Sequence, residues 1–308
     1  MVGLLILAAL FFSVWSKTSG TFLTSANLQV VIGNQAVIAV VAMGALIPLV
    51  CNEWDLSVGA NAGLSAVFVA TVLSHGTSIA VAILIGVGLG ALIGLINALI
   101  VTRLRVNAVI TTLGMATLID GVIVQKTHDL SVVSNIPASL VNFGSANWLG
   151  IPRTTYALAV VAALAYYVLV HTPVGRYLYA LGSNPKAARL VGLRTKLLLG
   201  ATFVGAGALA GGAGVLQVAR AGGADPHVGD GFTLPALAAA FLSAAAIKPG
   251  RYNVGGTLVA IFFLATLNSG LDLAGAASYV SSYVNGAALI VGVGLAGYLG
   301  RKRVGQAD

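Results

Sequence analysis

Long apolar runs without charged residues limit what this sequence can fold into more than any other feature. The segments 27–50 and 77–101 contain no Lys, Arg, Asp or Glu, and 58% of the 308 residues are hydrophobic while 8% are charged. Soluble domains carry about 25% charged residues, so no soluble fold could bury this much apolar surface. We therefore predict a polytopic membrane protein. It should be all-α, because the runs lack the alternating pattern of about 10 residues that marks membrane β-strands.

Hydropathy predicts about ten membrane helices in a single membrane domain covering residues 1–308. We read the first as a retained, rather short span and not as a signal peptide, because no basic residue precedes it. The third, eighth and ninth are short for a full crossing, and some of them are expected to be broken or tilted. The expected spans are 2–16, 27–50, 57–74, 77–101, 106–125, 153–170, 197–218, 233–247, 254–271 and 277–300.

The basic residues are distributed unequally between the two sets of loops. Basic residues gather on the cytoplasmic side of membrane proteins, which places both termini in the cytoplasm. The formal net charge of +8 then reflects topology, and we expect no nucleic-acid partner. Twelve lie on the predicted cytoplasmic side: Arg103, Arg105, Arg176, Lys186, Arg189, Arg194, Lys196, Lys248, Arg251, Arg301, Lys302 and Arg303. Four lie on the other: Lys17, Lys126, Arg153 and Arg220.

Enzyme and cofactor signatures are absent from the sequence. There is no Gly-x4-Gly-Lys-Ser/Thr motif for binding ATP and no His-Glu-x-x-His motif for zinc. The one cysteine, Cys51, excludes an internal disulfide framework and a cysteine-rich metal site. The glycines in 86–94 have the four-residue spacing that favours close packing of membrane helices. We expect no catalytic residue, metal or cofactor in this chain.

A few polar residues in or beside the spans are candidates for function. The predicted outer face carries Asp129, Asp225, Asp230 and Asp272. Charges within membrane spans are costly, and Asp120 is one of the few here. We expect Asp55 to cap the start of the third span. Glu53 either lines a cavity or pairs with a neighbouring subunit.

Neutral polar side chains are commoner in the spans than acids. They suit a wetted route for an uncharged, hydroxyl-rich solute, although hydrogen bonding between helices is the alternative role for each of them. The candidate route residues are Asn34, Gln35, Asn61, Asn268 and Tyr283.

The most unusual segment is a polar loop at 171–196, which we call the basic loop. Five of the 16 Lys and Arg residues lie there. Ser183 or Asn184 as N-cap, Pro185 at the first helical position and Gly192 as C-cap predict a short surface helix. Such a helix either seats in a cleft of another protein or lies on lipid headgroups.

Four motifs in this sequence resemble those of ABC-transporter permeases of the ribose/xylose/galactose type. They are Gly-Ser-Asn-Pro-Lys-Ala-Ala-Arg-Leu-Val-Gly-Leu at 182–193, Asp-Leu-Ser-Val-Gly at 55–59, Val-Asn-Ala-Val-Ile-Thr-Thr-Leu-Gly-Met at 106–115 and Leu-Asn-Ser-Gly-Leu-Asp-Leu at 267–273. They occur in family order, so the resemblance covers nearly the whole chain.

The resemblance implies an ABC importer permease fold of the type II-like class in the bacterial inner membrane. It also implies a second permease subunit, identical or related, a cytoplasmic ATPase that binds ATP and Mg²⁺, and a solute-binding protein on the outer side. The helix in the basic loop would be the coupling helix that docks in the ATPase. Its implied coupling residues are Gly182, Ser183, Asn184, Lys186, Ala187, Ala188 and Arg189.

The sequence also departs from that family. Leu-Ser-Ala-Ala-Ala-Ile-Lys-Pro-Gly at 242–250 replaces the usual Leu-Gly-Gly-x-Ser-x-x-Gly-Gly run, and Glu53-Trp54 replaces Gly-Ile or similar. The resemblance implies an importer of a monosaccharide or related polyol. The alternatives are a branched-chain amino-acid permease, a stand-alone secondary transporter or facilitator, and a non-transporting partner in a heterodimer.

Overall fold

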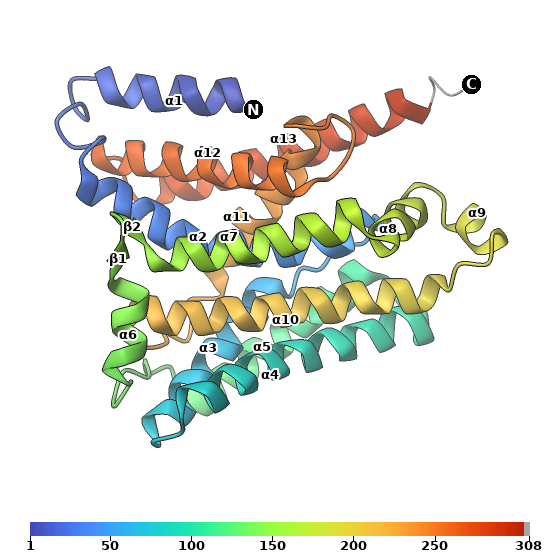
Figure 1. Ribbon diagram of the computed structural model, residues 1–308, viewed down its shortest axis with the longest axis horizontal. Coiled ribbons are helices and arrows are strands. Elements are labelled where there is room, and N and C mark those ends of the chain that lie inside the picture. The colour runs from blue at the N-terminus through green and yellow to red at the C-terminus, as the bar shows by residue number, and fades with distance from the viewer. Residues whose placement is uncertain (305–308) are drawn as a thin grey trace.

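The helices of this protein run side by side along one long axis (Figure 1). The computed structural model describes residues 1–304, with side chains described to Leu299, so the side chains of Arg301, Lys302 and Arg303 lie outside the described part. Two short strands, β1 (Asn147–Trp148) and β2 (Ile151–Pro152), pair antiparallel. The helices are α1 (Val2–Val14), α2 (Ser25–Val50), α3 (Val58–Ser74), α4 (Ile79–Leu99), α5 (Ala108–Thr127), α6 (Ala138–Ser145), α7 (Arg153–Tyr166), α8 (Pro173–Ser183), α9 (Pro185–Leu190), α10 (Thr195–Ala221), α11 (Asp230–Leu242), α12 (Val254–Leu273) and α13 (Tyr279–Val304).

Ten apolar helices correspond in order to the ten expected spans. Among the described residues, seven are long and apolar enough to cross a membrane, and α1, α3 and α11 are shorter apolar helices. The expectation of short third and eighth spans is confirmed. The ninth span was expected to be short, which is wrong, because α12 has 20 residues and extends to Leu273.

Helix α10 lies in the middle of the bundle and packs most extensively against α4, as well as against α2 and α3. Glycines allow this approach. A Cβ on Gly90 would collide with the carbonyl oxygen of Gly207, and a Cβ on Gly211 would collide with that of Gly86. Gly88, in the same run, faces open space. The close packing predicted from the glycine spacing is thus confirmed for the face of α4 that meets α10.

The link 51–57 between α2 and α3 runs from the end of the bundle, where Asn52 is exposed, into its interior, where Asp55 and Ser57 are buried. The Ser57 Oγ accepts a hydrogen bond of 2.9 Å from the Asn97 Nδ2, and Ser57 is fully buried. Asn97 lies about two turns before the end of the helix that continues α4 to Leu104, so Ser57 sits roughly 10 Å inside that end. Helix α3 is short because its first residues are replaced by this buried link.

A second link, 222–229 between α10 and α11, enters from the opposite end. A Cβ on Gly59, in the first turn of α3, would collide with the carbonyl oxygen of Gly229 and with Thr233 of α11. The two links therefore approach each other within the bundle. Non-helical backbone at membrane depth is tolerated where protein surrounds it, as it does here.

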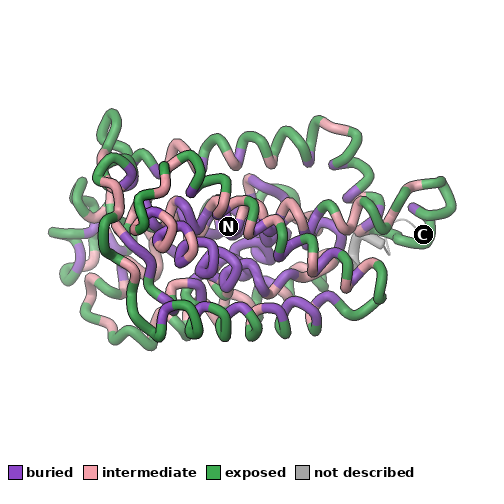
Figure 2. Tube along the Cα trace, turned by 90° about the horizontal axis from the view of Figure 1, so that it is seen from below, coloured by how far each residue is buried: buried purple, intermediate pink, exposed green. Residues whose placement is uncertain are grey.

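The two ends of the bundle differ in charge. One end, called the basic end, carries α8 and α9, and α13 ends toward it, while the start of α1 lies near the middle of the long axis (Figure 1). The other, called the acidic end, carries α6, the two strands and the loops with Asp129 and Asp225. Buried residues gather along the middle of the bundle, while both ends are largely exposed (Figure 2).

Candidate functional site

The basic loop folds into two short helices whose starts are capped by side chains. The Thr172 hydroxyl accepts a hydrogen bond of 3.3 Å from the Gly175 N–H at the start of α8. The Asn184 Oδ1 accepts from the N–H groups of Lys186 (3.1 Å) and Ala187 (3.0 Å), with Pro185 as the first residue of α9. Of the two expected N-caps, Asn184 therefore has this role.

The end of α9 also agrees with the sequence. Gly192 has a φ of +85°, which L side chains rarely adopt, and the next N–H, that of Leu193, donates to the Ala188 carbonyl at 3.1 Å. The expected surface helix is confirmed, with a glycine turning the chain after it. Its position at the tip of the basic end leaves one side open (Figure 1).

The implied coupling residues divide into two groups by the direction they face. Gly182 is half-buried, and only 3% of Ala188 is exposed, because these two face the body of the protein. The remaining five are exposed: Ser183, Asn184, Lys186, Ala187 and Arg189. A partner at the basic end would therefore contact the exposed five, while Gly182 and Ala188 hold the two helices in place.

Helix α8 is fixed against the end of α2. A Cβ on Gly182 would collide with the carbonyl oxygen of Val50, the last residue of α2. The Cys51 Sγ lies 3.7 Å from the Leu178 carbonyl oxygen, as a weak donor to it. Val50, Cys51, Leu178 and Ala188 belong to one buried apolar cluster, so a displacement of α8 would be transmitted to α2.

Helix α8 is also fixed to the turn between α11 and α12. The Tyr179 hydroxyl donates a hydrogen bond of 2.7 Å to the Tyr252 carbonyl, and the Arg251 guanidinium lies 3.8 Å from the centre of the Tyr179 ring. Arginine over an aromatic face contributes about 0.5–1 kcal/mol at exposed sites and more when desolvated. The basic loop is therefore joined to two other helix ends.

A cleft of about 390 Å³ separates the link 51–57 from α9, and Glu53 lines it. Three cations line the same cleft: Arg105, Arg189 and Lys196. Burial raises the pKa of the Glu53 carboxyl. The cavity-lining role, one of the two expected for Glu53, agrees with this position.

A buried polar network holds the link 51–57 in its bent path. The Asp55 Oδ1 accepts hydrogen bonds from the Ser57 N–H (2.9 Å) and the Ser57 Oγ (2.6 Å), and the Leu56 N–H donates to the Thr112 Oγ1 at 3.0 Å. Asp55 thus binds a free backbone N–H just before α3, as expected. The sequence did not indicate that Asn97 of α4 and Thr112 of α5 complete the network.

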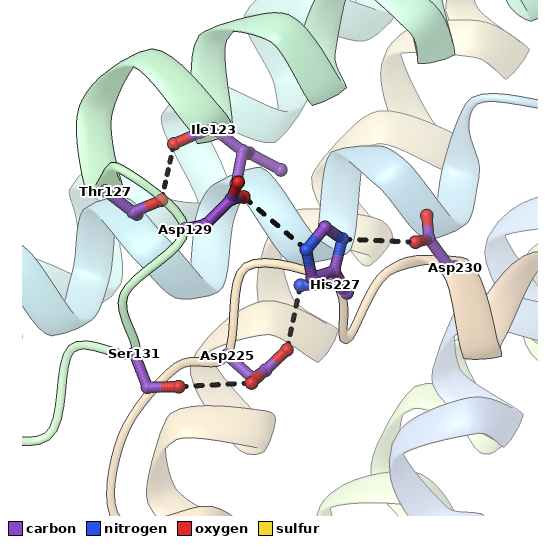
Figure 3. Close-up of polar contacts among 7 residues, drawn as sticks. All are labelled: Ile123, Thr127, Asp129, Ser131, Asp225, His227 and Asp230. Atoms are coloured by element: carbon purple, nitrogen blue, oxygen red, sulfur yellow. Dashed lines mark hydrogen bonds and ion pairs between the residues drawn. The ribbon is translucent and has the colours of Figure 1, made fainter.

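At the acidic end, His227 lies between two carboxylates (Figure 3). Its Nε2 is 3.5 Å from the Asp129 Oδ1 and its Nδ1 is 3.6 Å from the Asp230 Oδ2. Asp225 accepts from the His227 N–H at 2.8 Å and from the Ser131 hydroxyl at 3.1 Å. These contacts tie the loop after α5 to the link 222–229. The sequence located the acidic face, but no local pattern indicated that His227 bridges it.

Two of the candidate route residues form hydrogen bonds to separate neighbouring helices. The Asn34 Oδ1 accepts from the Arg220 Nε at 3.1 Å, which joins α2 to α10. The Asn61 Nδ2 donates to the Gly90 carbonyl at 3.1 Å, which joins α3 to α4. Both have the interhelical role that was the alternative reading of such residues.

The other three route candidates are Gln35, which follows Asn34 on α2, and Asn268 and Tyr283 on α12 and α13. The Asn268 Nδ2 donates to the Asn285 Oδ1 at 3.4 Å between α12 and α13. Gln35 is half-buried on α2, and 70% of Tyr283 is exposed on α13. The hydrogen bonds of Asn34, Asn61 and Asn268 join three different pairs of helices, and the part of the five candidates in a solute route stays a prediction.

Asp120 occupies a position that the sequence noted but did not explain. It is exposed on α5, one of the seven helices long enough to cross a membrane. A carboxylate in a membrane helix faces the inside of a bundle or a water-filled cavity, not lipid. This face of α5 is therefore covered by water or by another protein.

Residues 27–293 match a protein family described as "Branched-chain amino acid transport system / permease component". The chain belongs to this family. It is a permease component, hence a transport subunit and not an enzyme, and it is a multi-pass membrane protein.

Curated relatives of this permease are aligned over nearly its full length. It is 33% identical to the ribose import permease protein RbsC of Escherichia coli K12, over 95% of this chain and 91% of that one. It is 29% identical to the autoinducer 2 import system permease protein LsrC of Photorhabdus laumondii, over 91% of this chain and 84% of that one. It is 30% identical to the D-allose transport system permease protein AlsC of Escherichia coli K12, over 89% of this chain and 84% of that one. The resemblance to ribose-type ABC permeases drawn from the motifs is confirmed.

Proposed function

We propose that this permease carries a monosaccharide or related polyol into the bacterial cell as part of an ATP-driven importer. The relatives named for ribose and D-allose support a sugar-like solute. One structural observation supports coupling to a partner more than any other. The basic loop presents an exposed, capped helix while Gly182 fixes it to the end of α2.

We infer that the basic end faces the cytoplasm. Twelve of the 16 basic residues lie in the loops and the terminus that the sequence assigns to the same side as the basic loop. The positive-inside rule places that side in the cytoplasm. A cytoplasmic ATPase would then dock on the exposed residues of α9. ATP and Mg²⁺ would be bound by that partner, and this chain would hold no cofactor.

The contacts of α8 suggest how such docking would move the membrane helices. A shift of α9 would be carried through the Gly182 contact to α2 and through the Tyr179–Arg251 contact to the turn before α12. The link 51–57 follows α2 directly, so it would absorb part of the change. Differences in docking contacts between two states would supply the energy for alternating access.

The outer surfaces of the chain suit two further partners. Asp120 on α5 requires a covering that is not lipid, which a second permease and a wetted route between the two would provide. The exposed carboxylates Asp129, Asp225 and Asp230 at the acidic end would face a solute-binding protein. The second permease would be either another copy of this chain or a related chain.

The proposal is tested by ATP-dependent uptake into proteoliposomes that contain the complex purified from its native host through a tag on this chain. Ribose or D-allose uptake that requires ATP supports the proposal. ATP-dependent leucine uptake would instead favour the branched-chain amino-acid alternative. Sugar uptake without ATP would favour a secondary transporter, and no uptake of either solute would favour a non-transporting subunit.

The docking surface is tested with a matched pair of alanines. Ala187→Asp and Arg189→Glu should abolish co-purification of the ATPase while the permease stays folded, because both side chains are exposed. Ala188→Asp should destabilise the permease itself, because Ala188 is buried. If Ala187→Asp and Arg189→Glu leave ATPase binding intact, α9 is not the docking helix.

The solute route needs a separate measurement. Replacing Asn34 and Asn268 by Ala should lower uptake without dissociating the complex, if these residues line the route. Unchanged uptake in both variants would assign them to helix packing through Arg220 and Asn285 instead.

A further inference from the structure

A large cleft lies between the basic-end halves of α4 and α10. Its volume is about 1080 Å³, slightly above the range of roughly 300–1,000 Å³ for small-molecule pockets. Its walls are apolar and include Leu95 and Leu99 of α4 with Leu197, Ala201 and Val204 of α10. The two leucines of α4 and Leu197 are exposed by 43%, 48% and 65%, so the cleft is open sideways to the surroundings of the bundle.

Four cations form the end of this cleft: Arg103, Arg189, Arg194 and Lys196. All four are exposed, and none forms an ion pair within 4 Å of a described acidic residue. The described lining residues include no Asp or Glu. The cleft therefore joins an apolar wall to a positive end without ion pairs, and Arg189 and Lys196 of that end also line the neighbouring cleft that contains Glu53.

The length of the cleft corresponds to one leaflet of a membrane. From Leu95 to Arg103 the helix rises roughly 12 Å, and from Lys196 to Gly205 roughly 14 Å. Half of a hydrocarbon core is about 15 Å thick. The apolar wall would thus lie at the depth of acyl chains while the cations lie at the depth of headgroups.

We propose that this cleft binds an anionic phospholipid, with its acyl chains between α4 and α10 and its phosphate among the four cations. Basic pockets between membrane helices on the cytoplasmic side attract anionic headgroups. A free phosphate would contact the cations but would leave the apolar wall of the cleft without a partner. A soluble protein could not reach a wall that lies within the hydrocarbon. The proposal rests on the membrane location of the chain and not on the solute it carries.

The position of the lipid would give it an effect on coupling. Arg189 belongs to α9, and Arg194 is the N-cap residue of α10. A phosphate held by both, together with Arg103 of α4, would tether the basic loop to the membrane helices. An anionic leaflet would thereby stabilise the position of α9 before any partner docks.

The test is native mass spectrometry of the purified permease titrated with phosphatidylglycerol and, separately, with phosphatidylcholine of the same chains. The double variant Arg103→Gln/Lys196→Gln should bind phosphatidylglycerol roughly 30-fold more weakly, because each cation near an anionic lipid strengthens binding about fivefold. The double variant Lys126→Gln/Arg153→Gln removes the same charge at the acidic end and should bind like the wild type.

A second variant addresses the apolar wall without changing charge. Ala201→Trp should fill the exposed cleft and weaken phosphatidylglycerol binding, and the melting temperature of each variant shows whether it is folded. Equal binding of both lipids by the wild type, or undiminished phosphatidylglycerol binding by both cleft variants, would overturn the proposal. Full competition by glycerol phosphate would assign the site to a free phosphate. If the two cleft variants lose co-purification of the ATPase but bind phosphatidylglycerol as the wild type does, this face belongs to the protein partner and not to a lipid.

Discussion

Gly182 of α8 lies so close to the carbonyl oxygen of Val50, the last residue of α2, that no side chain fits between them. Gly182→Val should therefore push α8 away from α2 and destabilise the permease by about 1–3 kcal/mol. Solute-stimulated ATPase activity should fall further than stability alone explains, because the contact joins the basic loop to the membrane helices. Thermal unfolding and ATPase assays measure the two effects. Ala180→Val, at an exposed position on the same helix, should leave both unchanged.

The cap of α9 gives a second expected outcome. Asn184→Ala removes the acceptor of two backbone hydrogen bonds and should cost α9 about 1 kcal/mol. The affinity for the ATPase should fall several-fold, measured by surface plasmon resonance on the detergent-purified permease. Asn184→Asp keeps an acceptor in place and should restore binding. If the two variants bind equally weakly, the amide contacts the partner directly and its capping role is secondary.

The packing of α4 on α10 depends on one face of a glycine-rich helix. Gly90→Leu should lower the melting temperature by several degrees, because its side chain would meet the backbone of Gly207 and Gly211. Gly88→Leu introduces the same side chain into open space and should have little effect. If Gly90→Leu and Gly88→Leu lower the melting temperature equally, the effect comes from helix propensity and not from the close approach of α4 to α10.

The chain carries its own probe of the basic loop. Burial, with a contribution from nearby Glu53, raises the pKa of the Cys51 thiol to about 12. Maleimides react with the thiolate, so Cys51 should label at pH 7.5 at least roughly 100-fold more slowly than an exposed cysteine. Ala187→Cys in a Cys51→Ser background is the exposed comparison. Rapid labelling of Cys51 in the resting permease would show that α8 leaves the end of α2 readily.

Much of the architecture follows from local patterns in the sequence. The apolar runs gave ten helices in the right order, and the caps at Asn184 and Gly192 gave α9. The predicted ninth span, 254–271, ends two residues before α12 does, at Leu273. Boundaries of this kind depend on cap geometry that hydropathy does not measure.

The polar residues were harder to interpret from the sequence. Asn34, Asn61 and Asn268 have the same hydropathy whether they face water or a neighbouring helix, and the structure gives each of them a partner on another helix. His227 lies in a turn-rich segment whose pattern does not indicate which residues it meets. Its neighbour Asp129 is nearly a hundred residues earlier in the chain.

The sequence by itself therefore determined the helices, their order, the charge difference between the two ends and the short helix at the basic end. Each of these depends on interactions within a few residues or on the transfer of one segment into a membrane. Only the tertiary structure decided that the first turn of α3 and the link 222–229 meet inside the bundle, that Gly182 is fixed to Val50, and that a cationic cleft opens between α4 and α10. Those features depend on contacts between distant residues, which are set by how whole helices pack.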